Sequence, residues 1–304
     1  MTAQYSAGVH NPVMVREVLE VLSPAPGETF LDLTAGAGGH GFEIASRLGP
    51  EGLLVAMDRD AKILDIAGKR LTGAGLAQVR LVQGNFLDCR RALADAGVQR
   101  VDGILLDLGV SSFQLGDPER GFSFAQDGPL DMRMDPGCET TTAADVVNSA
   151  GEEELADIFF RYGQERHARR IARRIAEARR VEKITRTGQL ADIIRRAYGR
   201  YKWQRIHPAT RVFQALRIEV NDELGNLKGM LDIAPGLLRE EGRIAVISFH
   251  SLEDRIVKED FRNHARAGLY KLITKKPLRP SQAEIDSNPR SRSAKLRAAK
   301  RSGE

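Results

Sequence analysis

The fold is decided by the stretch Phe30-Leu31-Asp32-Leu33-Thr34-Ala35-Gly36-Ala37-Gly38-Gly39-His40. It begins as a short apolar strand, passes through a glycine-rich turn, and continues into a helix that we expect over residues 41–48. Glycines at 36, 38 and 39 can adopt positive φ angles and place no Cβ in the way of a ligand. A turn of this kind at the carboxyl end of a parallel strand is typical of sites for nucleotide-like cofactors.

A second apolar strand is predicted over residues 52–57, and it ends in Asp58-Arg59-Asp60. Asp58 follows the glycine turn by about 20 residues, where an acid commonly binds the two hydroxyls of a ribose. The alternative is a tight strand–helix turn that holds no ligand, because a glycine-rich turn alone is a weak signal.

The glycine spacing and the acid before it indicate which cofactor fits. Dinucleotide sites use G-x-G-x-x-G and place a pyrophosphate at the helix N-terminus, whereas this turn reads G-x-G-G and follows Asp32. A carboxylate there would repel a pyrophosphate but could pair with the ammonium of an amino-acid-bearing cofactor. The turn therefore favours S-adenosylmethionine over NAD, and a dehydrogenase is the least supported class of enzyme.

Composition bounds the class of protein. A chain of 304 residues with 42% hydrophobic content can bury a sizeable core in one large or two smaller domains. No apolar run approaches the ~20 residues that a membrane span needs, and the start of the sequence lacks the apolar region of a signal peptide. Cys89 and Cys138 lie far apart without metal-ligand spacing, so we expect a cytoplasmic protein without a metal site.

Charge is distributed unevenly along the chain. Residues 1–160 carry 12 Lys/Arg and 24 Asp/Glu, whereas residues 161–217 carry 17 and 4. The remaining residues carry 17 and 13. An acidic cofactor-binding half beside a strongly basic segment points to a polyanionic substrate, although charged helices are often only solvated faces.

Two further strands complete the predicted cofactor site. The strand over residues 79–83 ends in Gly84-Asn85-Phe86, and an aromatic side chain there could flank an adenine or pack in the core. The strand over residues 101–107 is apolar, as buried parallel strands are, and ends in Asp107. Since parallel strands end at the same edge of a sheet, Asp32, Asp58 and Asp107 should face one crevice.

The middle of the chain changes character. Residues 114–143 are rich in Gly, Pro and Asp and predict a long functional loop. Apolar residues at helical spacing then predict helices over 142–148, 152–162, 165–180, 187–198 and, further on, 212–231. Arginines cover much of the helix over 165–180, and aromatic residues alternate with basic ones over 198–205. This composition is typical of surfaces that bind phosphates and stack bases.

The last part of the chain contains a strand over residues 243–250 and a basic, turn-rich tail. We expect the tail either to be extended and to face RNA, or to be ordered only against the catalytic domain.

Four segments resemble a single family in long unbroken strings: 32–40, 102–135, 207–223 and Ser248-Phe249-His250-Ser251-Leu252-Glu253-Asp254-Arg255. The sequence is similar to the RsmH (MraW) family of small-subunit ribosomal RNA methyltransferases, and the similarity runs from His10 to the Arg-rich tail. The resemblance implies an α/β, Rossmann-like class I S-adenosylmethionine fold with a mostly parallel sheet and an inserted all-helical domain. We place the first part of the methyltransferase domain at residues 1–135, the basic helical RNA-recognition domain at 136–215, and the second part at 216–304.

The resemblance also implies the activity, which is methylation of the exocyclic N4 of a cytidine in the decoding region of 16S rRNA. Gly38, Gly39 and His40 should contact the methionine end of S-adenosylmethionine, Asp58 the ribose and Phe86 the adenine. The pocket should be completed by Asp107 and Gln114, to which the turn adds Asp32 and Gly36. The small ribosomal subunit is the expected partner, and the side chains expected to bind RNA are Arg169, Arg173, Trp203, Arg205 and Arg211. The sequence is compatible with a dimer and does not determine the oligomeric state.

Amino-methyltransferases commonly place an Asp/Asn-Pro-Pro-aromatic loop after the fourth strand to accept a hydrogen bond from the target amine. Here the corresponding stretch is Asp107-Leu108-Gly109-Val110-Ser111-Ser112, which keeps the carboxylate but lacks the prolines and the aromatic residue. We therefore expect Asp107 or a nearby carbonyl to accept the amine hydrogen bond, with Ser111, Ser112 and His250 shaping the cytosine pocket. Asp107 could instead bind only the cofactor, and His250 could be purely structural.

Two other functions compete with this hypothesis. A DNA amino-methyltransferase would share the cofactor chemistry but prefer a duplex with a flipped base. A non-enzymatic RNA-binding factor for ribosome assembly would use the fold as a scaffold, but three acidic strand ends disfavour a site that binds only phosphate.

Overall fold

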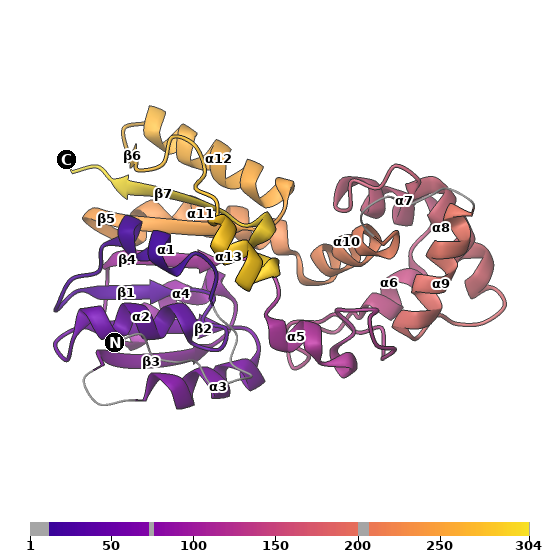
Figure 1. The fold of residues 1–304 in the computed structure, drawn as a ribbon, viewed down its shortest axis with the longest axis horizontal. Helices are drawn as coiled ribbons and strands as arrows, with labels where there is room; N and C mark the ends of the chain where they lie inside the picture. The colour runs from indigo at the N-terminus through magenta and orange to yellow at the C-terminus, as the bar shows by residue number, and fades with distance from the viewer. Residues whose placement is uncertain (1–11, 73–75, 200–206, 304) are drawn as a thin grey trace. The chain divides into compact units, whose positions relative to one another are not determined.

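The computed structural model describes residues 12–72, 76–199 and 207–303, which divide between two compact units. The sheet unit contains residues 1–109 and 225–304, and the helical unit contains Val110–Leu224. Figure 1 colours the two units along the chain, and the helical unit is the magenta to light-orange part. No helix among the described residues is both long and apolar enough to cross a membrane.

The sheet unit is built on one sheet whose described strands follow the order β3-β2-β1-β4-β5-β7-β6. The first five strands of the chain run parallel, while β7 runs antiparallel to both of its neighbours, β5 and β6. This is the mostly parallel, Rossmann-like class I arrangement that the sequence predicted. The strands are β1 (Thr29–Asp32), β2 (Leu53–Asp58), β3 (Gln78–Gln83), β4 (Val101–Asp107), β5 (Leu238–Ser248), β6 (Tyr270–Leu272) and β7 (Lys295–Arg301).

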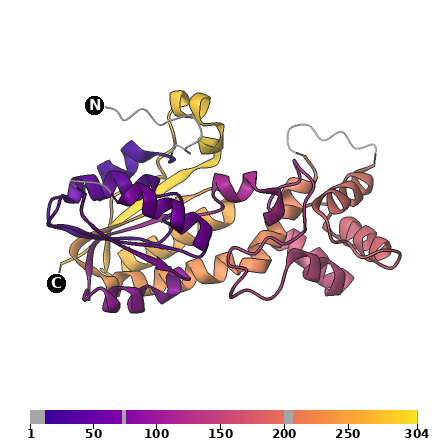
Figure 2. The ribbon, with the colours of Figure 1, turned by 90° about the horizontal axis from the view of Figure 1, so that it is seen from below.

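Helices cover both faces of this sheet, as Figure 2 shows from a second direction. Side chains that alternate along the strands form two separate cores. Phe30 and Leu54 join the core under α1 (Val15–Leu22), α2 (Gly39–Leu48) and α3 (Ala61–Leu71). Leu31 and Val55 join the opposite core under α4 (Cys89–Asp95), α11 (Glu223–Leu237) and α12 (Ser251–Arg266). Since both faces are buried, the central strands read as continuous apolar runs.

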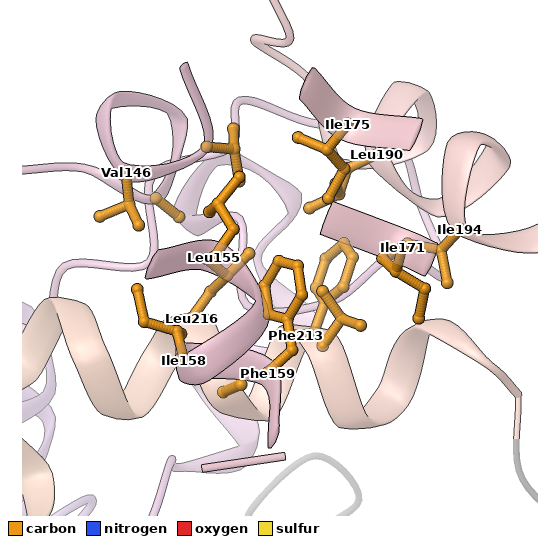
Figure 3. Packing of buried hydrophobic residues seen from close by; sticks show 14 of the residues in the cluster. Val146, Leu155, Ile158, Phe159, Ile171, Ile175, Leu190, Ile194, Phe213 and Leu216 are labelled. Atoms are coloured by element: carbon orange, nitrogen blue, oxygen red, sulfur yellow. The ribbon is translucent and has the colours of Figure 1, made fainter. Parts of the chain in front are cut away.

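The helical unit has its own hydrophobic core, shown in Figure 3. Phe159, Ile171 and Ile194 are fully buried in it, and each comes from a different helix. The helices are α5 (Ser112–Gly116), α6 (Ala143–Ser149), α7 (Glu152–Arg161), α8 (Ala168–Arg179), α9 (Thr187–Tyr198) and α10 (Ala209–Asn221). The predictions of helices over 142–148, 152–162, 165–180 and 187–198 are confirmed.

The boundaries of the helical unit differ from the predicted insert at 136–215. Phe122, Leu130 and Met132 lie in the stretch predicted as a loop, yet they are buried in the helical core. The Asn221 side chain fastens the same stretch, because it donates to the Met132 carbonyl at 2.8 Å and accepts from the Met134 amide at 2.7 Å. Buried contacts of this kind cannot be recognised in a Gly/Pro/Asp-rich composition. The predicted insert therefore begins at residue 136, whereas the helical unit begins at Val110.

The prediction of one helix over 212–231 is wrong, because the chain forms two helices that are separated at Asp222. Asp222 has a left-handed φ of 43° and ends α10, and α11 begins at the next residue. Asp tolerates this conformation better than most residues because its short side chain can hydrogen-bond locally.

The basic tail is ordered against the sheet unit, which confirms one of the two alternatives from the sequence. It forms α13 (Gln282–Ser287), the 3₁₀ turn η3 (Pro289–Ser293) and β7. Lys295 at the start of β7 pairs with Ser248 at the end of β5. The tail is therefore part of the fold rather than a separate extended arm.

Candidate active site

Three neighbouring strands present a carboxylate at the same edge of the sheet. Asp32, Asp58 and Asp107 are the last residues of β1, β2 and β4, and β1 lies between the other two strands. Because these strands are parallel, all three carboxyl ends meet at one edge. The predicted convergence of the three acids is therefore built into the sheet.

The glycine turn folds over this edge through backbone hydrogen bonds. The Ala35 amide donates to the Met57 carbonyl at 2.8 Å, which ties the turn to β2. Gly38 has a φ of +76° and forms the N-cap of α2, a conformation that favours glycine. A Cβ at Gly39 would lie 3.0 Å from Pro12 Cβ and Cγ. These two positions need glycine for backbone shape and close packing, respectively.

Asp58 joins the turn to the second strand. Its Oδ2 accepts from the Gly36 amide at 2.8 Å and its Oδ1 from the Asp60 amide at 3.0 Å. Burial raises the pKa of Asp58, and these backbone bonds partly offset that effect. A carboxylate has about four lone-pair sites, so Asp58 keeps acceptor capacity for ligand hydroxyls.

Asp32 is a buried carboxylate, with only 1% of its surface exposed. Its Oδ1 accepts from the Thr34 amide at 3.1 Å, whereas its Oδ2 is buried and has no hydrogen-bond partner among the described residues. Burial raises the pKa of Asp32 to about 6, and the nearby His40 opposes this rise. The neighbouring charges of Asp107 and Asp58 raise it further.

The backbone of Asp107 is fixed by a hydrogen bond, and its side chain is partly exposed to solvent. Its amide donates to Thr34 Oγ1 at 2.6 Å, which links the β1 and β4 ends. Its Oδ2 lies 3.6 Å from His40 Nε2, and its buried Oδ1 has no hydrogen-bond partner among the described residues. The Asp107 side chain is 24% exposed, so this acid can be reached from outside in a way that Asp32 cannot.

This arrangement fits a cofactor that carries an ammonium group. A buried carboxylate oxygen without a partner is costly, and a cation satisfies it better than a neutral donor. Asp32 Oδ2 and Asp107 Oδ1 are two such oxygens beside a turn whose glycines allow close approach. A pyrophosphate would meet three acids here, so the donor set fits S-adenosylmethionine and disfavours NAD.

Comparison with known proteins agrees with this geometry. A family model described as the MraW methylase family matches residues 7–302. The chain belongs to this family. The proteins named "Ribosomal RNA small subunit methyltransferase H" from Syntrophotalea carbinolica and Geobacter sulfurreducens are 53% and 52% identical to it, and each match covers 96% of this chain and 98% of the relative. The protein of that name from Koribacter versatilis is 47% identical over 96% of this chain and 94% of its own length.

His250, predicted to shape the substrate pocket of this MraW-family protein, forms the N-cap of α12. Its Nδ1 accepts from the Glu253 amide at 3.3 Å, and Glu253 Oε2 accepts from the Phe249 amide at 2.8 Å and the His250 amide at 3.2 Å. Glu253 Oε1 lies 3.1 Å from His250 Nε2. His250 Nε2 is buried and makes no hydrogen bond with another described residue, although the Glu253 carboxylate lies close to it. The structure therefore gives His250 a capping role, and a direct role in the reaction stays a prediction.

Ser111, Ser112 and Gln114 belong to the helical unit and start α5. Ser111 Oγ accepts from the Gln114 amide at 3.1 Å, and Gln114 Oε1 accepts from the Ser111 amide at 2.9 Å. This reciprocal pair is a capping box, so Ser111 and Gln114 have a structural function that the sequence analysis missed. Their predicted roles at the pocket stay predictions.

Phe86 follows β3 at its carboxyl end and starts the 3₁₀ turn η1 (Phe86–Asp88). It is partly buried and packs against the core under α4, α11 and α12. Core packing, the alternative to an adenine contact, is therefore present, and the adenine contact stays a prediction. The preceding Asn85 donates to the Asn226 side chain at 2.8 Å, which ties this turn to α11.

The predicted RNA-binding arginines lie on exposed helix faces where they can be described. Arg169 and Arg173 project from α8, whose other face is buried through Ile171 and Ile175, and Arg211 is exposed on α10. Trp203 and Arg205 lie outside the described residues. Other arginines of the helical unit are engaged in the fold, since Arg186 pairs with Asp127, Arg217 with Glu223, Arg195 with Asp192, and Arg179 donates to the Val147 carbonyl.

Three residues at the site were not singled out from the sequence. Thr34 accepts from the Asp107 amide, Asp60 caps α3 by accepting from the Lys62 amide at 3.1 Å, and Glu253 completes the α12 cap. An Asp immediately before a helical run is a recognisable N-cap signal, so Asp60 could have been found. Nothing local marks Thr34, because its partner is 73 residues away.

Proposed function

We propose that this protein transfers a methyl group from S-adenosylmethionine to the exocyclic N4 of a cytidine in the decoding region of 16S rRNA. The observation that carries the proposal is the pair of unpartnered carboxylate oxygens beside the glycine turn: Asp32 Oδ2 can accept from the cofactor's ammonium and Asp107 Oδ1 from the target amine. Membership of the MraW methylase family and the printed name of the relatives support the choice of small-subunit rRNA.

In this proposal, different residues of the sheet unit bind different parts of the cofactor. Asp32 binds the ammonium, Gly36, Gly38, Gly39 and His40 line the methionine end, and Asp58 accepts from the ribose hydroxyls. Phe86 completes the proposed set at the adenine. When bound, S-adenosylmethionine supplies an electrophilic methyl group on a sulfonium.

Asp107 is the group that we assign to the target amine. The N4 lone pair of cytosine is delocalised into the ring, so the nitrogen must become pyramidal as its new bond to carbon forms. A carboxylate that accepts a hydrogen bond from the amine favours this change and the loss of one proton from N4. Asp107 suits the role because its backbone is fixed by Thr34 while its side chain stays partly exposed.

The exposed arginines of α8 are proposed to bind the rRNA backbone. Arg169, Arg170 and Arg173 make no ion pair with another described residue, unlike Arg174, which pairs with Glu177 at 2.8 Å. Guanidinium groups bind phosphates through paired hydrogen bonds, and such contacts hold an RNA in place without reading its sequence. The predicted RNA contacts of Trp203, Arg205 and Arg211 remain part of the proposal.

The test is transfer of tritiated methyl from S-adenosylmethionine to 30S subunits, followed by nucleoside analysis. Label in N4-methylcytidine is the expected result. Label in another nucleoside would keep the cofactor and overturn the target atom. No label, on subunits that a known methyltransferase modifies, would mean that the substrate is free rRNA or that the protein is a non-enzymatic assembly factor. A duplex DNA substrate in parallel tests the DNA amino-methyltransferase alternative.

A further inference from the structure

The C-terminal stretch Asn288-Pro289-Arg290-Ser291-Arg292-Ser293-Ala294-Lys295-Leu296-Arg297 carries four basic side chains, and Lys300 and Arg301 follow them. The structure assigns four of these six to the fold. Asp254 accepts from Lys295 at 2.9 Å and from Arg297 at 2.7 Å. Lys300 pairs with Glu241, and Arg301 donates to the Leu238 carbonyl. These four cations are engaged in contacts that anchor β7.

Arg290 and Arg292 differ from the other four. Both side chains are exposed, and neither makes a hydrogen bond or an ion pair with another residue in the described part of the chain. They stand on either side of Ser291, which is completely buried. Both arginines therefore extend from one turn into solvent.

The turn that carries the two arginines is firmly held. Ser291 donates to the Asn288 carbonyl through its amide at 2.9 Å and its hydroxyl at 2.8 Å, and the Ala294 amide donates to the Ser291 carbonyl at 2.8 Å. The preceding helix α13 is fastened to α1, because Glu284 Oε1 accepts from the Met14 amide at 2.7 Å. A turn that is already ordered in the free protein loses less conformational entropy when its side chains bind a ligand.

The position of η3 relates it to the three carboxylates. Lys295 pairs with Ser248, so the residues just before β7 lie beyond the carboxyl end of β5. This is the edge at which β4 ends in Asp107, since β4 and β5 are parallel and adjacent. Figure 1 shows α13, next to η3, at this end of the sheet.

We propose that Arg290 and Arg292 bind backbone phosphates of the RNA substrate next to the target nucleotide. The inference rests on the proposed function and adds a second RNA contact that is built into the sheet unit itself. Three acids at the same edge repel a polyanion, so nearby cations are needed to hold RNA there. Guanidinium groups without protein partners suit phosphate oxygens because of their paired, charged hydrogen bonds.

The test compares two double variants of the full-length protein. Arg290→Gln with Arg292→Gln removes the proposed contacts. Arg262→Gln with Arg266→Gln is the matched control, because these exposed arginines lie near the far end of α12, about 20 Å from the end that starts at the carboxyl edge. Binding to 30S subunits is measured over a range of salt concentrations, and binding of S-adenosylmethionine is measured separately.

We expect the first variant to bind subunits about tenfold more weakly. The slope of the logarithm of the binding constant against the logarithm of the salt concentration should also fall in magnitude by about two, one for each lost phosphate contact. Cofactor affinity should not change, and the control should bind subunits like the wild type. Equal binding by all three proteins, or equal losses in both variants, would overturn the proposal. Wild-type protein that binds subunits but never methylates them would refute the proposed function alone, because the binding comparison still decides the role of the two arginines.

If the double variant loses cofactor affinity as well, the single variants Arg290→Gln and Arg292→Gln replace it. Each should lower the salt slope by about one, and the charge-preserving Arg→Lys pair should keep the wild-type slope. Single variants with the wild-type slope would overturn the proposal.

Discussion

Asp32 is a carboxylate whose charged form is disfavoured by burial in the folded protein. Its pKa rises from 3.8 to about 6 because it is buried. Between these values the folded protein binds a proton that the unfolded chain has released, so the free energy of unfolding falls as the pH rises from about 4 to 6. The penalty is then fully present at pH 7, and it is on the order of 3 kcal/mol.

We therefore expect Asp32→Asn to stabilise the free protein at pH 7 by up to about 3 kcal/mol and to weaken binding of S-adenosylmethionine. The gain in stability should shrink as the pH is lowered towards 4. Urea unfolding at several pH values measures the first effect, and calorimetric titration with the cofactor measures the second. A variant that is less stable at pH 7 and binds the cofactor normally would contradict the assignment of Asp32.

Asp107→Asn separates the two roles considered for Asp107. The amide keeps the shape and one acceptor oxygen but loses the charge, so we expect methyl transfer to fall at least about 100-fold, while cofactor affinity changes little. Single-turnover methylation of 30S subunits and cofactor titration are the two measurements. Wild-type turnover would eliminate the acceptor role, and loss of cofactor affinity would leave Asp107 as a cofactor ligand only.

Helix α12 depends on the His250 cap, which can be tested at the scale of the element. Asn is a strong N-cap residue and Ala is a weak one, so His250→Ala should cost about 1 kcal/mol of stability and His250→Asn much less. A purely structural His250 predicts that His250→Asn retains methyl transfer, because the Asn side chain can accept from the Glu253 amide as Nδ1 does. Thermal unfolding and methylation rates are compared for the two variants. A stable His250→Asn protein without activity would instead assign the imidazole to the reaction.

At the scale of the whole molecule, the hydrophobic cores of the two units share no residues. The helical unit is also nearly neutral, with 19 Lys/Arg against 18 Asp/Glu over Val110–Leu224. The strong positive charge of residues 161–217 is therefore balanced by acids such as those in the first turn of α7. The helical unit is therefore basic only on particular helix faces. The charge counted over residues 161–217 does not represent the net charge of the whole unit.

Because its core is complete in itself, we expect residues 110–224 to fold as an isolated fragment. Circular dichroism should show a helical spectrum and a cooperative thermal transition. The matched control is a fragment limited to residues 136–215, which lacks Leu130, Met132 and Asn221 and should be much less stable. Equal stability of the two fragments would contradict the importance of this anchor.

The sequence alone established much of the sheet unit and its acidic edge. Asp32, Asp58 and Asp107 were predicted correctly as strand ends because apolar strands and glycine turns are signals carried by neighbouring residues. The sequence analysis missed the helix caps at Ser111, Gln114 and His250, although Ser111 and Gln114 have the spacing of a capping box. Their hydrogen bonds depend on the dihedral angles of a single turn, and Ser, Gln and His also occur in catalytic sites.

What the sequence determined by itself is the first four strands and the three carboxylates at their edge, since these follow from local periodicity and from the parallel arrangement of strands. The class I fold was implied by the resemblance to the MraW family. Only the tertiary structure decided the boundaries of the helical unit, the break at Asp222, and which basic side chains of the tail remain free to bind a ligand. Asn221 reaches Met132 across 89 residues, and Arg297 reaches Asp254 across 43. Contacts between residues so far apart in the sequence produce no periodic pattern, so they cannot be predicted from the sequence and are seen only in the packed structure.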